Sequence, residues 1–276
     1  MTVKEQTIQP HAELYPVDKL LRADRLPHIL CPGCGIGTVI HGYVHAIAAS
    51  GVDEDNHVCV SGIGCSGRAS GYVNVDSYHA THGRALPFAL GIAVHNPELN
   101  VTVISGDGDL TAIGGNHLIH AARRNVNLNV ICINNFNYGM TGGQVGPTTP
   151  IGAKGTTAPN GAVEYPFNLP YLAKATGAIF VARWTILHVR EFQDAVLRSM
   201  NKQGFCFIEV LAPCPTSFGK ANKIGDGLHE VEIYRERCRV ENGAPDVEAL
   251  DIDLIDESKA ITVGNFVDIE RKPFMV

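Results

Sequence analysis

The chain has 276 residues, of which 45% are hydrophobic and 18% charged, and its formal net charge is −6. That length suits one large α/β domain with a buried core, or two small domains. The negative charge offers no basic surface for nucleic acid or anionic lipid, and no apolar run approaches the roughly 20 residues of a membrane-spanning helix.

The amino-terminal segment is polar and of mixed charge, which is not the pattern of a secretory signal. We therefore expect a cytoplasmic protein, in which disulfides are rare and cysteines more often bind metal or take part in chemistry. Eight cysteines is a high count for such a protein. Their positions need a chemical explanation.

Alternating apolar and amphipathic stretches predict strands and helices in turn. Residues 1–27 have no apolar period, and we expect them to be irregular; residues 28–217 form the predicted domain. Residues 218–276 are charged and weakly periodic, and we expect this tail to pack on a partner subunit. In chain order, the domain is predicted to contain helix 35–50, strand 57–61, helix 86–95, strand 101–105, helix 112–124, strand 128–134, strand 179–182, helix 188–202 and strand 205–211.

Short apolar strands separated by helices indicate an α/β fold with a doubly wound, mostly parallel sheet and helices on both faces. One long segment, residues 140–170, is rich in glycine, proline and threonine and has no predicted element. Irregular segments of that length inside a domain usually have a function or are ordered by a partner.

A turn rich in glycine and aspartate follows the predicted strand 101–105. Gly106, Asp107, Gly108 and Asp109 stand where the carboxyl ends of parallel strands form a ligand-binding crevice. Glycines let the backbone approach a phosphate there, and the next helix presents its first N–H groups. Asp107 could hold a hard cation that bridges phosphate oxygens. The alternative is an ordinary tight turn in which Asp109 caps the helix.

The next predicted strand ends in a second polar run, NNFNYG, over residues 134–139. If strands 101–105 and 128–134 are neighbours, Asp107 and Asn135 emerge at the same edge and can share one ion. A carboxylate, an amide oxygen and a backbone carbonyl suit Mg²⁺ that keeps water and phosphate as its other ligands.

Together, the two runs resemble the diphosphate-binding motif of thiamine-diphosphate enzymes. The resemblance implies that Asp107, the Asn135 side chain and the Asn137 backbone carbonyl ligate Mg²⁺. It further implies that the diphosphate is lined by the residues that follow, Gly139, Met140, Thr141, Gly142, Gly143 and Gln144.

Two of the eight cysteines lie in the run CPGCG at residues 31–35, which opens a predicted helix. A thioredoxin-like redox pair would need a preceding strand, which residues 22–30 do not supply. A zinc site would need a second close pair of ligands, which the sequence lacks. An iron–sulfur cluster needs four thiolates, which can come from distant loops.

The other six cysteines differ in their surroundings. Cys59, Cys132 and Cys206 lie inside apolar strands, where cysteine is usually a small buried hydrophobe, and Cys238 lies in the charged tail. Cys65 and Cys214 each follow a predicted strand, on the side of the sheet where the crevice is expected. Topology therefore favours four cysteines as cluster ligands: Cys31, Cys34, Cys65 and Cys214.

The runs CPGCG, SGIGCSGR, HGR, GDGD and PCPT occur in this order over about residues 28–217. The series resembles the β subunit of 2-oxoacid:ferredoxin oxidoreductases, with the 2-oxoglutarate type as first choice. The resemblance implies CoA-dependent oxidative decarboxylation of a 2-oxoacid, or the reverse reductive carboxylation. Electrons would pass through a [4Fe–4S] cluster on the four cysteines to ferredoxin, and the cofactors would be thiamine diphosphate and Mg²⁺. The α subunit would supply the rest of the active site, including a glutamate that this chain lacks at a recognisable position.

The resemblance also gives roles to individual loop residues. Gly62, Ile63, Gly64 and Ser66 would contact the cofactor while presenting Cys65, and the loop with His82 and Arg84 would lie near it. Arg68 could bind a substrate carboxylate, because guanidinium and carboxylate form paired hydrogen bonds; a solvated surface arginine is the alternative. The candidate catalytic residues are Arg68, His82 and Arg84.

Because Arg68 suggests a substrate with a second carboxylate, 2-oxoglutarate is the first choice, and pyruvate and branched-chain acids stay open. Two other functions also stay open from the sequence alone. A non-oxidative thiamine-diphosphate decarboxylase or carboligase would share Asp107 and Asn135 but would have no use for the cysteines. A non-enzymatic metal-binding scaffold would use the cysteines and not the cofactor.

Overall fold

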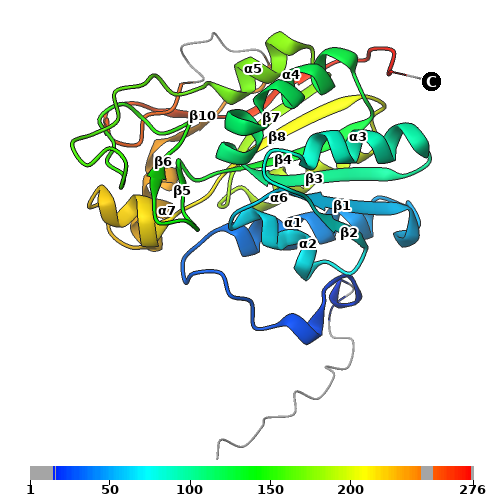
Figure 1. The fold of residues 1–276 in the computed structure, drawn as a ribbon, viewed down its shortest axis with the longest axis horizontal. Helices are drawn as coiled ribbons and strands as arrows, with labels where there is room; N and C mark the ends of the chain where they lie inside the picture. The colour runs from blue at the N-terminus through cyan, green and yellow to red at the C-terminus, as the bar shows by residue number, and fades with distance from the viewer. Residues whose placement is uncertain (1–14, 16, 244–250, 275–276) are drawn as a thin grey trace, which may run out of the picture.

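The structure, a computed structural model, describes residues 15, 17–243 and 251–274. Its centre is an eight-stranded sheet with the order β2-β1-β3-β4-β8-β7-β10-β9 (Figure 1). Six neighbouring strands are parallel: β2 (Asp76–His79), β1 (His57–Ser61), β3 (Asn100–Gly106), β4 (Leu128–Asn134), β8 (Phe205–Leu211) and β7 (Phe180–Thr185). The mostly parallel sheet is confirmed.

Helices cover both faces of this sheet, as Figure 1 shows. On one face lie α1 (Ile36–Ala49) and α6 (Val189–Met200), and on the other α3 (Ala85–His95), α4 (Gly115–Arg124) and α5 (Leu169–Thr176). Each face therefore has its own apolar core. All seven residues of β4 are buried, which explains why this strand reads as a continuous apolar run.

Most predicted elements are present with shifted ends. The predicted helix 112–124 begins as a π-helical turn, Asp109–Ile113, before α4. Strand β2, the short helix α2 (Ala69–Tyr72) and helix α5, which begins inside the segment 140–170, were not predicted. The residues of β2 are mostly exposed, so this edge strand has no apolar alternation from which it could be recognised.

The carboxy-terminal segment, residues 218–276, was expected to be a tail without helices or strands, and the structure corrects this expectation. It contains α7 (Gly227–Arg237) and two strands, β9 (Cys238–Val240) and β10 (Ile261–Asp268). β10 pairs antiparallel with β7 and buries Ile261, Val263 and Phe266, while β9 pairs parallel with β10. The segment thus completes the sheet, and its contact with a partner subunit stays a prediction.

The described part of the amino-terminal segment is irregular, as expected, but it is packed on the domain. Two short 3-10 turns, Asp18–Leu20 and Ala23–Arg25, precede a single bridge between Leu21 and Val73. The expectation for residues 1–14 and 16 lies outside the described residues. Among the described helices, we find none with the length and apolar character needed to cross a membrane.

Candidate functional site

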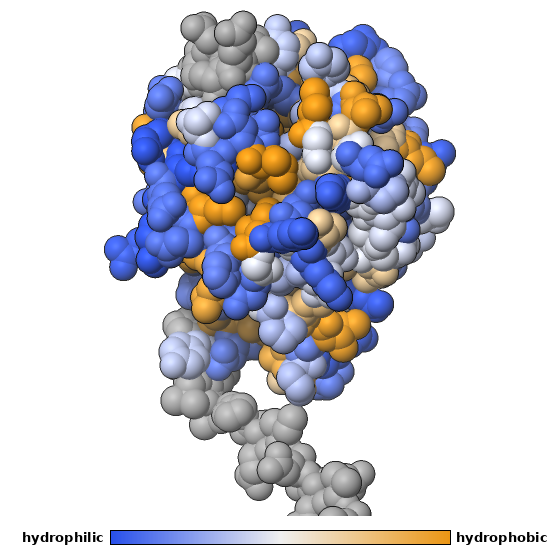
Figure 2. Space-filling view, turned by 90° about the vertical axis from the view of Figure 1, so that its left-hand side faces the viewer, coloured by the Kyte–Doolittle hydropathy of each residue, from blue (hydrophilic) through white to orange (hydrophobic). Residues whose placement is uncertain are grey.

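Four neighbouring strands, β1, β3, β4 and β8, end at one edge of the sheet. The loops that follow them carry Cys65, Asp107, Asn135 and Cys214, in that order. Because β3 and β4 pair directly, with Gly106 opposite Ile133, Asp107 and Asn135 emerge at the same edge, as predicted. Figure 2 shows this side of the molecule, where hydrophobic side chains gather near the centre among polar ones.

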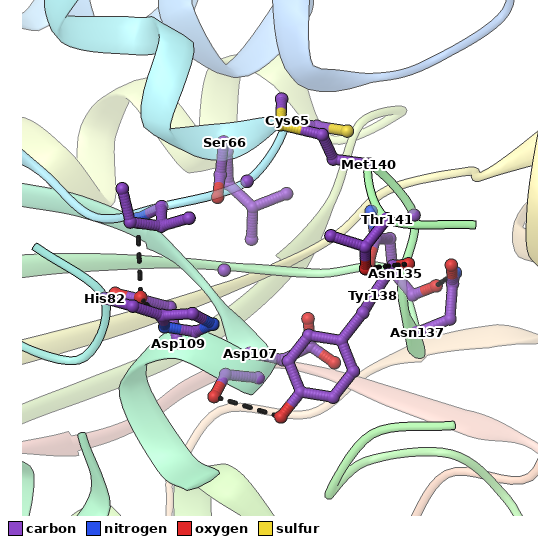
Figure 3. A pocket seen from close by; sticks show the side chains of 16 residues that line it. Cys65, Ser66, His82, Asp107, Asp109, Asn135, Asn137, Tyr138, Met140 and Thr141 are labelled. Carbon is purple, nitrogen blue, oxygen red and sulfur yellow. Dashed lines mark hydrogen bonds and ion pairs between the residues drawn. The ribbon is translucent and has the colours of Figure 1, made fainter. Parts of the chain in front are cut away.

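A cavity at this edge, which we call the aspartate cavity, is lined by most of the residues that the sequence assigned to the cofactor (Figure 3). The exceptions among them are Gly62, Gly142, Gly143 and Gln144, and two lining residues, Ile133 and Tyr138, were not predicted. The cavity is lined by Ile63, Gly64, Cys65, Ser66, His82, Gly106, Asp107, Gly108, Asp109, Ile133, Asn135, Asn137, Tyr138, Gly139, Met140 and Thr141.

Asp107 is the chemically unusual group in this cavity. Its side chain is only 2% exposed, and burial raises its pKa from the ordinary 3.8 to about 7, against the opposing effect of a hydrogen bond from the Thr148 hydroxyl. Burial disfavours the charged form because the carboxylate loses its hydration. A bound cation would reverse this effect, so Asp107 fits the role of a magnesium ligand.

The two asparagines after β4 lie on either side of a sharp turn. Phe136, between them, has a φ of 63°, a left-handed conformation that a bulky residue seldom adopts. Asn137 Nδ2 donates to the Asn135 backbone carbonyl at 2.6 Å, whereas the Asn135 side-chain amide has no hydrogen-bond partner in the described part of the chain. An amide without a partner beside Asp107 also fits a metal ligand.

Both carboxylate oxygens of Asp109 accept hydrogen bonds from neighbouring groups. Oδ1 accepts hydrogen bonds from the backbone N–H of Gly83 at 2.8 Å and of Ile63 at 3.3 Å, and Oδ2 accepts one from the Ser105 hydroxyl at 2.7 Å. His82 Nδ1 also contacts Oδ1, without the geometry of a hydrogen bond. The carboxylate makes no capping hydrogen bond at the helix start. Asp109 therefore fastens the loops after β1 and before α3 to β3.

Gly62 does not line the cavity, and its lack of a side chain has another explanation. A Cβ added there would lie 2.0 Å from Asp109 Oδ2 and 2.1 Å from the Ser105 hydroxyl oxygen. Both contacts are far shorter than atoms allow. Glycine at this position therefore serves the close approach of Asp109, and direct contact of Gly62 with a cofactor stays a prediction.

The four predicted cluster cysteines all line a second cavity, which we call the thiol cavity. It adjoins the aspartate cavity, because both are lined by Cys65, Asn135, Gly139 and Met140. A Cβ added at Gly139 would lie 3.2 Å from the sulfur of Cys214 and 3.8 Å from that of Cys65. Two loops that are distant in the sequence thus bring their thiols to one place.

No three His, Cys, Asp or Glu side chains of the described residues are grouped so that they could hold a metal ion. A cluster spreads its iron atoms over several corners, so its thiolates need not converge on one point. The four cysteines line one cavity, in which Cys31 is exposed and Cys34, Cys65 and Cys214 are half-buried. Ligation by these cysteines stays a prediction.

Burial sets the chemistry of these thiols. It raises the pKa of Cys34 to about 11 and also raises that of Cys65, and the charges of the other thiolates in the cavity add to both shifts. Four thiolates this close would repel one another, and iron would offset their charge. By contrast, Cys59, Cys132 and Cys206 are fully buried within strands, which confirms their predicted hydrophobic role.

The three candidate catalytic residues differ in their placement. Arg68 is exposed, lines the thiol cavity and makes no ion pair within the described residues. His82 lines the aspartate cavity. Arg84 lines neither cavity, and its guanidinium donates to the carbonyl of Gly83 at 3.3 Å. Their catalytic roles stay predictions, and the placement of Arg84 supports its role least.

Sequence reasoning missed the polar residues that hold the site from behind. Thr148 and Thr149 come from the irregular segment, where nothing local marked them as buried. Arg183 and Glu209 lie inside the apolar strands β7 and β8 and are an ion pair, with Nε and Oε2 2.6 Å apart. A charged residue inside an apolar strand indicates a buried ion pair, because charged side chains are almost never fully buried without a partner. This signal could have been used to find Arg183 and Glu209.

Comparison with known proteins places this geometry in a family. Residues 31–210 match the family described as thiamine pyrophosphate enzyme, C-terminal TPP binding domain. The 2-oxoglutarate synthase subunit KorB of Methanothermobacter marburgensis is 48% identical over 256 residues, which cover 93% of this chain and 88% of that protein. KorB of Methanocaldococcus jannaschii is 45% identical over 262 residues, 95% of each chain.

A solved structure is also similar over nearly the whole chain. It is a 2-oxoglutarate:ferredoxin oxidoreductase from Magnetococcus marinus with 2-oxoglutarate, coenzyme A and succinyl-CoA bound. The TM-score is 0.82 and the sequence identity 29%, over 96% of this chain and 89% of the other.

Proposed function

Because the chain belongs to the β subunits of 2-oxoacid:ferredoxin oxidoreductases, and to the 2-oxoglutarate type among them, we propose that it binds thiamine diphosphate in a 2-oxoglutarate:ferredoxin oxidoreductase. The reaction is the CoA-dependent oxidative decarboxylation of 2-oxoglutarate to succinyl-CoA, or the reverse reductive carboxylation. The names of the KorB relatives, and the ligands of the Magnetococcus enzyme, support this choice of substrate.

The observation that carries the proposal is that the two cavities adjoin. The aspartate cavity offers a buried carboxylate, the side-chain amide of Asn135 and a glycine-rich backbone, which suit Mg²⁺ and a diphosphate. The thiol cavity offers four cysteines directly beside it. A non-oxidative thiamine-diphosphate enzyme needs no thiols there, whereas an oxidoreductase needs an electron acceptor close to its cofactor.

In this proposal, the side chains at the edge of the sheet hold charges in place. Asp107, Asn135 and the Asn137 carbonyl bind Mg²⁺, which offsets the charge of the diphosphate. Thiamine diphosphate supplies the electron sink that decarboxylation needs. The cysteines Cys31, Cys34, Cys65 and Cys214 hold a [4Fe–4S] cluster, from which electrons pass to ferredoxin.

The site is completed by a second chain. No glutamate is among the described residues that line the two cavities, so we propose that the α subunit supplies the one that activates the cofactor. Arg68 binds the second carboxylate of 2-oxoglutarate. A cytoplasmic location follows from the need to keep these thiols reduced.

The test is a substrate panel on the assembled enzyme. The chain is purified without oxygen together with its partner subunits, and CoA-dependent reduction of a low-potential dye is measured with 2-oxoglutarate, pyruvate and branched-chain 2-oxoacids. We expect the highest kcat/KM for 2-oxoglutarate. Release of CO₂ without dye reduction would instead identify a non-oxidative enzyme.

A further inference from the structure

We infer that Asn134 is a positioning residue for the magnesium loop, the segment from Asn135 to Asn137, and that the buried pair of Arg183 and Glu209 holds Asn134 in place. This inference rests on the proposed function, since it concerns the binding of Mg²⁺ and thiamine diphosphate. Asn134, Arg183 and Glu209 are not among the described residues that line the aspartate cavity.

Arg183 and Glu209 lie on the neighbouring strands β7 and β8, and both are almost completely buried, at 1% and 0% exposure. Arg183 Nε donates to Glu209 Oε2 at 2.6 Å, and its Nη1 donates to the Thr262 carbonyl of β10 at 3.4 Å. Burying such a pair costs hydration that its attraction does not reliably repay. Stability alone therefore gives no reason for an ion pair here.

The second carboxylate oxygen of Glu209 connects the ion pair to the magnesium loop through Asn134. Oε1 accepts a hydrogen bond from Asn134 Nδ2 at 2.7 Å. This contact leaves the other end of the Asn134 amide, Oδ1, to accept the backbone N–H of Phe136 at 3.1 Å. Glu209 thus fixes which way the amide faces, and the amide in turn caps Phe136.

Phe136 needs that support because its backbone is left-handed, with a φ of 63°. Such a conformation in a bulky residue persists only where the surroundings determine it. Its carbonyl accepts a second hydrogen bond, from the Thr149 hydroxyl at 2.6 Å, and its ring packs against Phe218. Both polar groups of the Phe136 backbone are therefore held.

The same turn sets the two predicted magnesium ligands of the loop. Asn135 and Asn137 flank Phe136 directly, and both line the aspartate cavity together with Asp107 (Figure 3). The neighbouring Thr148 donates to Asp107 Oδ2. One continuous set of contacts thus joins the ion pair of β7 and β8 to the predicted ligands in the aspartate cavity.

The experiment measures Mg²⁺ binding by calorimetry in the assembled enzyme, with thiamine diphosphate present and no substrate. Asn134→Ala should raise the dissociation constant of Mg²⁺ about tenfold or more, as is usual when a group that orients metal ligands is removed. The matched control is Asn129→Ala at the other end of β4, where a buried asparagine donates to Asn100 Oδ1 at 2.9 Å. This control should change the constant by less than about threefold.

A polarity swap separates positioning from general damage. In Asn134→Asp alone, two carboxylates face each other, and Mg²⁺ binding should weaken further than in Asn134→Ala. In the double variant N134D/E209Q, the amide of residue 209 can donate to the carboxylate of residue 134, which still accepts from Phe136. We expect binding within about threefold of the wild type. Failure of the double variant to improve on Asn134→Asp would overturn the inference.

A second pair of variants leaves Asn134 and the ion pair intact, and so tests the loop even if the Asn134 variants do not fold. Thr149→Val removes the hydroxyl that holds the Phe136 carbonyl, while Thr149→Ser keeps it. Only the valine variant should weaken Mg²⁺ binding. Equal binding by these two variants, or by Asn134→Ala and Asn129→Ala, would refute the positioning role. If the wild type binds neither Mg²⁺ nor thiamine diphosphate, the proposed function itself fails.

Discussion

Replacing Asp107 by asparagine should stabilise the metal-free chain while it abolishes magnesium binding. The difference between the ordinary pKa of 3.8 and the folded pKa of about 7 corresponds to about 4 kcal/mol. The folded state binds this proton more tightly, so the favourable contribution is present below pH 4 and is lost as the pH rises to about 7. Asparagine offers one acceptor oxygen fewer to the local backbone donors, so we expect a net gain of about 2–4 kcal/mol above pH 7.

The assay is urea unfolding of the chain, free of metal and cofactor, at pH 5 and pH 8. The stability gain of Asp107→Asn should be clearly larger at pH 8 than at pH 5. Adding Mg²⁺ and thiamine diphosphate at about 1,000 times the dissociation constant should reverse the order, because the ligand then stabilises only the wild type, by about 4.1 kcal/mol, which exceeds the gain of the variant. A gain that does not change with pH, or a variant less stable than the wild type at pH 8, would refute the reasoning.

Three further predictions, each tested by substitution, concern the rest of the site. Serine in place of any of the four predicted cluster cysteines should remove most of the bound iron, whereas Cys238→Ser, outside the thiol cavity, should leave the iron content unchanged. Gly62→Ala should destabilise the chain by about 1–3 kcal/mol in thermal unfolding, because its Cβ would meet the Asp109 carboxylate at 2.0 Å; an unchanged Tm would contradict this. Arg68→Ala should raise the KM for 2-oxoglutarate about tenfold or more and leave that for pyruvate unchanged; equal effects on both substrates would show that Arg68 does not recognise the second carboxylate.

The candidate site at the edge of the sheet could be predicted from the sequence, because the motifs that mark it are short and each directly follows a predicted strand. An apolar strand followed by glycine and aspartate, and a second strand followed by asparagines, imply a common edge once the strands are neighbours. The cysteine assignment used the same rule. Cys65 and Cys214 follow β1 and β8, which flank β3 and β4 in the sheet, so their approach depends on strand order alone.

The residues that hold the site in place could not be predicted, because their contacts are with residues distant in the sequence. Thr148 reaches Asp107 across 41 residues, and no local pattern in a glycine- and threonine-rich segment marks that contact. Phe136 adopts a backbone conformation that its own side chain disfavours, so the turn is set by Asn134 and Thr149 rather than by its residue type. Asp109 had the sequence of a helix cap, and only the folded loops show that it joins three segments.

The carboxy-terminal segment shows a different limit. Its last strand, β10, has a buried pattern over most of its length, but it follows a long charged stretch and pairs antiparallel at the far side of the sheet. Reading the chain for βαβ units gives no reason to look for such a strand. Its charge and position after the last motif suggested an appended tail instead.

The most direct test is anomalous X-ray scattering at the iron edge, from crystals of the assembled enzyme grown without oxygen and with Mg²⁺ and thiamine diphosphate. We predict an iron peak within the thiol cavity, contacted by Cys31, Cys34, Cys65 and Cys214, and a diphosphate beside Asp107 and Asn135. Zinc in that cavity, or a diphosphate bound away from Asp107, would contradict the claim that the four strand ends bring a cofactor and an electron acceptor together.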